Sequence, residues 1–257
     1  MEILIRPTPE AVAAQAADII AGYVQHGSVL GLATGSTPIA TYQELIRRHQ
    51  QEGLSFAGCK VFMLDEYLGL DPQHEQSYAR TIRREFTEHI DINDSDVFSP
   101  SGNSGDPLAA AADYERHITS EHVAIQLLGI GSNGHIGFNE PTSSLNSVTR
   151  LKTLHPQTIR DNARFFDTPD EVPTHVLTQG LATIRRAGHL LLVATGASKA
   201  AAIAATVEGP LSSMCPASTL QLHPHATVLI DEEAASQLTF REYYQYADQN
   251  KPAFQGY

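Results

Sequence analysis

The sequence predicts an α/β fold: one doubly wound, mostly parallel sheet, Rossmann-like, with helices on both faces. Short apolar segments typical of buried strands alternate with amphipathic segments of helical period along the whole chain. Turns that contain glycine join strand ends to helix starts. The 257 residues, 42% of them hydrophobic, supply a sizeable core, and no linker divides them, so we expect a single domain over 1–257.

Strands are predicted where apolar residues run together between turn residues. In chain order they are expected at 1–6, 29–33, 60–64, 123–130, 190–194 and 227–230. The run at 123–130 leads directly into a glycine-rich turn. Such continuous apolar runs are typical of strands that are buried on both faces.

Helices are predicted where apolar residues recur every three or four positions. Thr8 and Pro9 indicate the N-cap and the first position of one helix, and Pro38 begins a second. Further helices are expected at 77–89, 107–120, 198–207 and 239–247. Residues 142–175 are polar and weakly periodic, so we interpret them as an excursion with short elements. Stretches of this length in compact domains often form functional lids.

Composition excludes several classes of function. A net charge of −12 argues against nucleic acid and anionic membranes as partners. No apolar run is long enough to span a membrane, and residues 1–6 are too short and too acidic for a signal peptide. Cys59 and Cys215 have no metal-type spacing and are expected to be small core residues in a reducing compartment. We therefore expect a cytoplasmic protein.

Four loops are expected at the carboxyl edge of the sheet, where ligands of such folds bind. They are 33–38, 64–69, 129–140 and 194–199. All the candidate site residues that the pattern suggests, apart from Arg164, lie on them.

The loop at 129–134 matches the G-x-G-x-x-G spacing of dinucleotide-binding turns. That motif requires a helix after the third glycine and an acidic residue about 20 positions later. Here Gly137 and Pro141 interrupt the would-be helix, and 150–155 contains no acid. The glycines instead indicate a tight turn that approaches a ligand closely.

His135 follows this turn, with Asn133 and Glu140 close to it in sequence. A histidine oriented by a carboxylate is the usual arrangement of a general acid/base near neutral pH. A purely structural histidine remains the alternative. A metal site would need a third ligand, and His223 and His225 are far away in sequence, so no metal is predicted.

Asp65 and Glu66 follow the predicted strand 60–64, at the same edge of the sheet as Gly131. Adjacent acids at a strand end usually form a solvated turn. A partly shielded acid here could instead remove a proton from a carbon beside a carbonyl group.

Three features suggest a phosphate site. The turn Thr34, Gly35, Ser36 and Thr37 feeds a helix N-terminus whose N–H groups could bind an anion, although Ser36 or Thr37 could simply cap the helix. Lys199 is expected in the first turn of the helix 198–207, where the dipole disfavours a cation unless an anionic ligand is present. Arg164, in the polar excursion, could add a second contact, although nothing local distinguishes it from a surface arginine.

Together these residues resemble the family of isomerising glucosamine-6-phosphate deaminases. Eight blocks match in order over nearly the whole chain: Ala33–Pro38, Leu64–Tyr67, Gly134–Pro141, Ser143–Leu145, Thr149–Leu154, Asn162–Asp167, Gly196–Ala200 and Leu220–Pro224. The related 6-phosphogluconolactonases share the fold and a similar glycine turn, but not the continuation Phe138–Pro141. The resemblance implies conversion of glucosamine 6-phosphate to fructose 6-phosphate and ammonia, without a metal or redox cofactor.

The resemblance also implies roles for the residues. His135, in a relay with Glu140 and Asn133, would open the sugar ring, and Asp65 would move a proton from C2 to C1. The phosphate would rest on the turn at 34–37, Arg164 and Lys199, under a lid at 142–175. Some family members have Asp where this chain has Asn133, which leaves Glu140 as the only carboxylate of the relay and predicts a shifted pH profile.

Some members are hexamers activated by N-acetylglucosamine 6-phosphate. The residues that they use resemble Ser143, Arg150, Lys152 and Tyr243, although members with similar residues are not all activated. A homo-oligomer with a sugar-phosphate substrate is therefore expected. The alternatives are a sugar-phosphate lactonase or isomerase of the same fold and a non-catalytic sugar-phosphate sensor.

Overall fold

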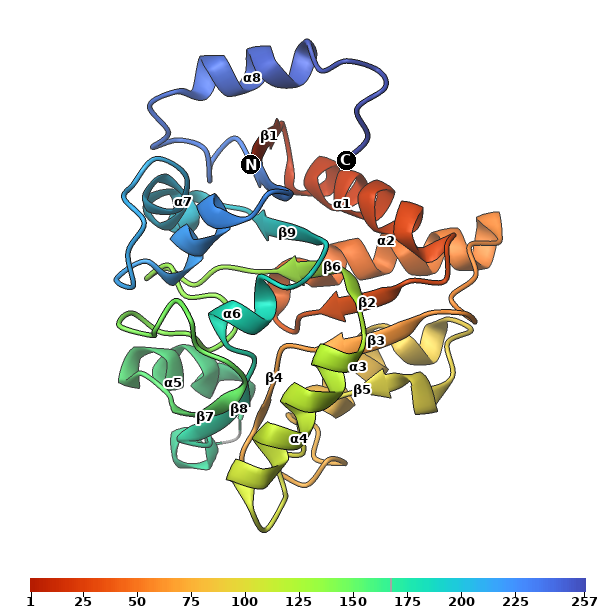
Figure 1. Ribbon diagram of the computed structural model, residues 1–257, viewed down its shortest axis with the longest axis vertical. Coiled ribbons are helices and arrows are strands. Elements are labelled where there is room, and N and C mark those ends of the chain that lie inside the picture. Colours follow the sequence, from red (N-terminus) through yellow and green to blue (C-terminus); the bar gives the residue numbers. More distant parts are fainter. Residues whose placement is uncertain (167) are drawn as a thin grey trace.

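The computed structural model describes residues 1–166 and 168–257 and has the α/β architecture that the sequence predicts (Figure 1). Seven strands form one parallel sheet in the order β1-β10-β9-β6-β2-β3-β5. They are β1 (Glu2–Arg6), β2 (Val29–Leu32), β3 (Lys60–Met63), β5 (Val97–Phe98), β6 (Val123–Leu128), β9 (His189–Ala194) and β10 (Ala226–Asp231). A second, antiparallel sheet has the order β4-β8-β7 and consists of β4 (Asp65–Tyr67), β7 (Arg150–Thr153) and β8 (His175–Thr178).

The helices lie on both sides of the large sheet (Figure 1). They are α1 (Pro9–Val24), α2 (Ser36–Glu52), α3 (Tyr78–Glu85), α4 (Pro107–Ser120), α5 (Pro156–Asn162), α6 (Leu181–Ile184), α7 (Ala200–Val207) and α8 (Arg241–Gln249). Short 3₁₀ segments occur at Thr87–His89, Asp94–Asp96, Ala163–Phe165, Pro169–Glu171, Ala197–Lys199 and Pro216–Leu222. As predicted, Thr8 caps α1, because its hydroxyl accepts a hydrogen bond from the N–H of Ala11.

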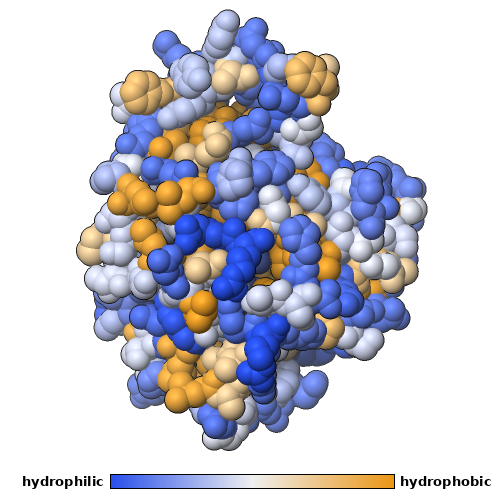
Figure 2. Space-filling view, in the orientation of Figure 1, coloured by the Kyte–Doolittle hydropathy of each residue, from blue (hydrophilic) through white to orange (hydrophobic). Residues whose placement is uncertain are grey.

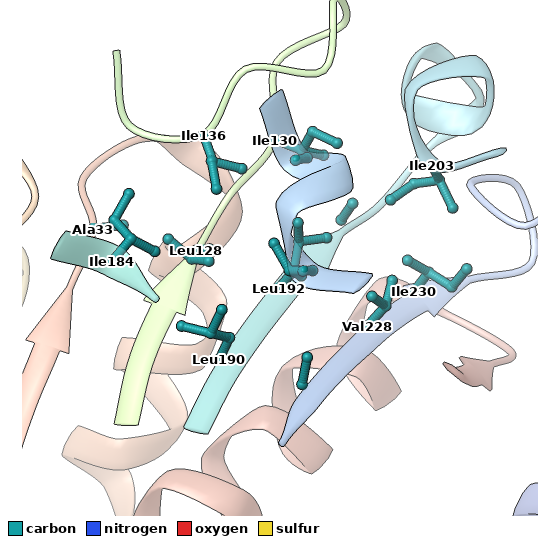
Figure 3. Packing of buried hydrophobic residues seen from close by; sticks show 14 of the residues in the cluster. Ala33, Leu128, Ile130, Ile136, Ile184, Leu190, Leu192, Ile203, Val228 and Ile230 are labelled. Carbon is teal, nitrogen blue, oxygen red and sulfur yellow. The ribbon is translucent and has the colours of Figure 1, made fainter. Parts of the chain in front are cut away.

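Alternate residues of the strands build two cores, one on each face of the sheet. Leu191 of β9 packs with residues of α1, α2 and α3 on one face. Leu190 and Leu192 lie on the other face with residues of α4, α6 and α7. Figure 3 shows these two leucines on β9, in the same cluster as Ile203 of α7. Successive side chains of a strand point to opposite faces, so continuous apolar runs are needed in this sheet.

The direction in which the chain adds strands reverses between β2 and β6. From β2 the chain adds β3 and β5 on one side, and β6 then pairs with the other side of β2 and continues to β9 and β10. The carboxyl ends on either side of such a switch point diverge and leave a crevice between their loops. The loops after β2 and β6 follow the two strands at this switch point, so a ligand is expected between them.

The small sheet was not predicted from the sequence. The acids after β3 do not form a solvated turn, because Asp65 and Glu66 lie in the buried strand β4. β4 pairs with β8, and β8 pairs with β7, both of which come from the stretch around 142–175. Strands of three or four residues are too short to show a periodic pattern.

Several helix boundaries differ from the prediction, and α8 covers Arg241–Gln249 in place of 239–247. The helix expected at 77–89 ends at Glu85, because the fully buried Phe86 leaves the helical conformation and stacks on Tyr42 at a centroid distance of 4.7 Å. α2 begins at Ser36 and not at Pro38. A proline is tolerated there because the first-turn N–H groups of a helix have no partner within it.

The face in view in Figure 2 is mostly hydrophilic, and its hydrophobic residues form several separate patches. Within the described ranges, the structure contains no helix of the length and apolar character that a membrane span requires.

Candidate active site

The loop after β6 is a series of turns and contains no helix between residues 129 and 141. This absence of a helix confirms the prediction that the glycine spacing does not form a dinucleotide-binding turn. Gly131 is needed for another reason: a Cβ at this position would lie 2.2 Å from the His135 ring. Gly134 and Gly137 have φ angles of 82° and 53°, which strain residues with a Cβ.

Asn133, His135 and Glu140 are brought together by this loop. Nδ1 of His135 lies 2.7 Å from Oδ1 of Asn133 and 3.4 Å from Oε2 of Glu140. Nδ2 of Asn133 donates to the same Oε2 at 2.7 Å. Since an amide oxygen only accepts, His135 carries its proton on Nδ1 when it is neutral. This tautomer leaves Nε2 as the basic ring atom.

Glu140 is held as a carboxylate. Its burial opposes ionisation, but the hydrogen bond and charge of His135, together with donors from Thr158 and Asn133, lower the pKa from 4.5 to about 2. Oε1 accepts from the Thr158 hydroxyl at 2.5 Å. The side chain of Glu140 therefore supplies a negative charge beside His135 over the physiological pH range.

Asp65 lies on β4, at the far side of the same loop. A Cβ at Gly137 would be 3.5 Å from Oδ2 of Asp65, so the loop passes directly over the carboxylate. Asp65 is only 6% exposed, and within the described residues its carboxylate accepts no hydrogen bond. Burial and the neighbouring charge of Glu66 raise the pKa of Asp65 well above 3.8. A carboxylate in this state is a stronger base than a solvated one.

Glu66 has a structural role, unlike its neighbour. Its carboxylate accepts from the backbone N–H groups of Tyr67, Tyr78 and Ala79 at 2.8–2.9 Å. The last two belong to the first turn of α3. Burial raises the pKa of Glu66, although these three hydrogen bonds act in the opposite direction.

Lys199 lies at the carboxyl end of β9, which neighbours β6. Its Nζ donates to the carbonyl of Ile130 at 2.7 Å, so the ammonium group is next to the loop that carries His135. The predicted position in the first turn of an α-helix was wrong, because α7 begins at Ala200 after a 3₁₀ turn over Ala197–Lys199.

The charge conflict predicted for Lys199 is resolved within the protein. The carboxylate of Asp231 accepts from the N–H of Gly196 at 3.0 Å, and that of Glu233 accepts from Ala197 at 3.2 Å. These carboxylates occupy the free N–H groups of the turn, so no anionic ligand is required to stabilise it. The Lys199 side chain is therefore the part of this turn that can contact a phosphate.

The turn Thr34–Thr37 follows β2, on the other side of β6. The N-cap of α2 is Gly35, with a φ of 111°, and no side chain caps this helix. Capping by Ser36 or Thr37, the simpler interpretation of the sequence, is thus not realised. The first N–H groups of α2 follow the carboxyl end of β2 and have no side-chain cap, so an anion could bind there.

Arg164 is not brought into contact with the other proposed phosphate residues. It lies in the 3₁₀ segment Ala163–Phe165, is exposed, and has its guanidinium 4.7 Å from the centroid of the Phe165 ring. The stretch 142–175, described except at residue 167, contains β7 and α5.

The four residues suggested for an effector site fall into two groups. Ser143 follows the His135 loop, and Arg150 and Lys152 lie on β7. The buried hydroxyl of Ser143 has no partner within the described chain, and burial lowers the pKa of Arg150. Tyr243 lies on α8, at the opposite end of the long axis (Figure 1). One chain therefore does not assemble all four.

Features at the amino edge of the sheet do not join this site. The ring of His225 stacks on His189 at 3.7 Å, and Nε2 of His223 contacts the carbonyl of Ala187. In the described part of the chain, no three His, Cys, Asp or Glu side chains are grouped to hold a metal ion. Cys59 is buried as expected.

Cys215 differs from the prediction of a core residue, because it is half-buried, with Sγ 3.6 Å from the Thr206 hydroxyl. It lies beside the glycine turn of the site, where a Cβ at Gly134 would be 2.8 Å from its Sγ.

Thr158 and Asp231 were missed by the sequence analysis. Thr158 lies in a weakly periodic polar stretch, and nothing local indicates a contact with Glu140, 18 positions earlier. Asp231 ends an apolar strand, as many solvated acids do. Both contacts arise from tertiary folding, so their sequence signal is weak.

Comparison with known proteins gives a consistent set of relatives. A family model described as glucosamine-6-phosphate isomerases/6-phosphogluconolactonase matches residues 4–229. A glucosamine-6-phosphate deaminase of Corynebacterium kroppenstedtii is 65% identical over 258 residues, which is 100% of both chains. One of Rhodococcus jostii is 54% identical over 259 residues, again 100% of both.

Two solved structures place the fold among the same proteins. A monomeric glucosamine-6-phosphate deaminase has a TM-score of 0.90 at 45% identity and covers 92% of this chain and 100% of its own. A 6-phosphogluconolactonase from Trypanosoma cruzi has a TM-score of 0.72 at 19% identity, with 93% and 97% covered. At that identity the second likeness concerns the fold alone.

Proposed function

This chain belongs to the family of glucosamine-6-phosphate isomerases and 6-phosphogluconolactonases, and we propose that it is a glucosamine-6-phosphate deaminase. The reaction consumes glucosamine 6-phosphate and water and yields fructose 6-phosphate and ammonia, a step of amino-sugar catabolism. Relatives that match the full length of the chain carry the deaminase name.

His135 opens the sugar ring in this proposal. Nε2, the basic atom of its Nδ1–H tautomer, takes the proton of the anomeric hydroxyl and returns it to the ring oxygen. The carboxylate of Glu140 stabilises the imidazolium that forms between the two transfers. Asn133 fixes the ring orientation, since its amide accepts from Nδ1 and donates to Glu140.

Asp65 then acts on carbon. In the open chain, C2 carries the amino group beside the C1 aldehyde, which makes its hydrogen acidic. Asp65 removes this proton to form an enolamine and delivers it to C1, and water replaces nitrogen at C2 as ammonia leaves. A buried base that accepts no hydrogen bond from the described residues is suited to this step, because none of these residues has to be displaced first.

The phosphate group binds at the other side of the loop. The N–H groups at the start of α2 and the ammonium of Lys199 lie at the ends of the two strands that flank β6. Arg164 reaches the phosphate by movement of the segment after α5, which forms part of the proposed lid over 142–175.

The observation that carries the proposal is the position of Asp65 beside Gly137, in the loop of His135. Hydrolysis of a lactone requires an activated water but no base for a carbon-bound proton, so the lactonase alternative leaves Asp65 without a role. A sugar-phosphate isomerase would use the same base, and ammonia release distinguishes it from the deaminase. A non-catalytic sensor likewise requires neither Asp65 nor the relay of His135.

The test is ammonia release from glucosamine 6-phosphate by the wild type and by Asp65→Asn. We expect release by the wild type and a loss of about 10³-fold in kcat for the variant, in the range typical of a general base. Absence of release by the wild type contradicts the deaminase, and unchanged turnover of Asp65→Asn contradicts the assigned base. Hydrolysis of 6-phosphogluconolactone by the wild type would support the alternative.

We also propose that N-acetylglucosamine 6-phosphate acts as an effector only in a homo-oligomer, such as a hexamer. The reason is the separation of Tyr243 on α8 from Arg150 and Lys152 on β7 within one chain (Figure 1). Light scattering and kcat/KM, each measured with and without the effector, test this proposal. Activation of a strictly monomeric protein by the effector would contradict it.

A further inference from the structure

Helix α5 carries a buried hydroxyl that contacts the relay of His135. Oγ1 of Thr158 donates to Oε1 of Glu140 at 2.5 Å, and Thr158 is 7% exposed. The other oxygen, Oε2, accepts from Asn133 and faces His135. Among the described residues, Thr158 is the one side chain that hydrogen-bonds Oε1.

A second contact extends from the same side of α5. Asn162 is four residues after Thr158 and therefore lies on the same helix face. Its Nδ2 donates to the phenolic oxygen of Tyr67 at 2.7 Å. Tyr67 belongs to β4, the strand of Asp65. One helix face thus connects the carboxylate of the relay with the strand of the carbon base.

We propose that Thr158 is a positioning residue for ring opening, which deepens and rests on the proposed deaminase function. A carboxylate held only through Oε2 could rotate about its terminal bond and move away from His135. The Thr158 hydroxyl fixes the second oxygen and so keeps Oε2 facing the ring. Hydrogen bonds to an ionised acceptor are the stronger ones, which suits this role.

The first test compares Thr158→Val, which keeps the shape and removes the hydroxyl, with Thr158→Ser, which restores it. For ammonia release we expect kcat of Thr158→Val to fall about tenfold, with KM changed less than about threefold, because one charged hydrogen bond is lost. Thr158→Ser should stay within about threefold of the wild type. Equal kcat in all three proteins overturns the proposal.

The matched control is Thr183→Val. Thr183 is a buried threonine on α6 whose hydroxyl donates to the carboxylate of Glu115 at 2.8 Å, remote from the relay. This variant should show the stability loss of a deleted hydroxyl–carboxylate bond and wild-type kcat. A similar fall in kcat for Thr183→Val would show that general destabilisation, and not alignment of Glu140, causes the effect.

An independent measurement does not need turnover. The carboxyl ¹³C shift of Glu140, followed by NMR against pH, should show a pKa higher by about one unit in Thr158→Val and unchanged in Thr158→Ser. His135 is the titratable group that faces Glu140, and it is retained in all variants. If Thr158→Val does not fold, Thr158→Ala takes its place. An unmoved titration overturns the proposal, whereas a wild type without ammonia release contradicts only the deaminase function.

Discussion

At the scale of single residues, Asn133 changes the electrostatics of the relay less than its lack of charge suggests. Its amide presents an acceptor to His135 and a donor to Glu140, which is the pairing that each neighbour requires. An aspartate at this position would lie beside a second carboxylate, which would raise the pKa of one of the two. With asparagine at position 133, Glu140 is the one member of this group of three residues that carries a negative charge.

The acid limb of the pH profile is expected to belong to Asp65. The pKa of Glu140 is about 2, so Glu140 is already ionised when Asp65, whose pKa lies well above 3.8, begins to lose its proton. The base is active only when it is deprotonated, so kcat/KM should fall as pH decreases through the pKa of Asp65. A profile of kcat/KM from pH 3 to pH 9 measures this limb, and a flat profile down to pH 4 would contradict the assignment.

Gly131 offers a test of how His135 is packed. Gly131→Ala places a Cβ 2.2 Å from the imidazole ring, which must then leave its position beside Asn133. We expect kcat for ammonia release to fall at least about 10²-fold, the typical contribution of a general acid/base. The control is Gly129→Ala, since no atom lies within 4 Å of a Cβ there. Equal activity of the two variants would argue against this packing.

The residues that the sequence could reveal are those with local context. His135, Glu140 and the glycines stand in one short loop after a strong strand signal, so their grouping could be predicted. Thr158 could not, since its partner is 18 residues away and its surroundings lack a periodic pattern. The burial of Asp65 could not be predicted either, because it depends on pairing with β8, more than 100 positions later.

At the scale of elements, the turn after β9 places the cation Lys199 and is held by the carboxylate of Asp231. Asp231, at the end of β10, accepts from the N–H groups of Gly196 and Ala234, which joins two neighbouring strand ends. The turn is thereby fixed before any substrate binds, and Lys199 is directed toward Ile130. The longer helices and most strands of the large sheet were predicted from the sequence. The hydrogen bonds by which the distant Asp231 closes this turn were not.

Asp231→Asn should disturb this turn. The amide keeps one acceptor oxygen in place of two, so the free energy of unfolding is expected to fall by about 1–3 kcal/mol. KM for the sugar phosphate should rise because Lys199 is less well placed. Urea denaturation and steady-state kinetics measure the two effects. Glu233→Gln, which affects a single contact of 3.2 Å, should change both much less.

At the scale of the whole molecule, the two cores on opposite faces of the sheet depend on the same central strands. β9 contributes Leu190 and Leu192 to one core and Leu191 to the other. This arrangement follows from alternation along a strand that is covered on both sides, and it was predictable from the continuous apolar run. What the sequence did not predict is the second sheet, whose strand β4 carries Asp65.

Leu191→Ala should destabilise the protein as a whole. The residue is fully buried in the central strand β9, and truncation of such a leucine costs about 2–5 kcal/mol. A shift of the urea midpoint with an unchanged slope measures this loss. Leu108→Ala, at a leucine that is 70% exposed, should change stability by less than about 0.5 kcal/mol. Similar midpoints for both variants would contradict the position of the core.

The alternation of side chains along the three residues of β4 decides which acid faces the loop of His135. Because neighbours on a strand face opposite ways, Asp65 faces the loop of His135 while Glu66 faces the start of α3. Which acid acts as the proposed base therefore depends on whether the number of residues between that acid and β3 is odd or even. Deletion of Leu64 would move Glu66 into the place of Asp65 and Tyr67 into the place of Glu66. The loop of His135 would then face a longer carboxylate, and α3 would lose the carboxylate that accepts from its first turn.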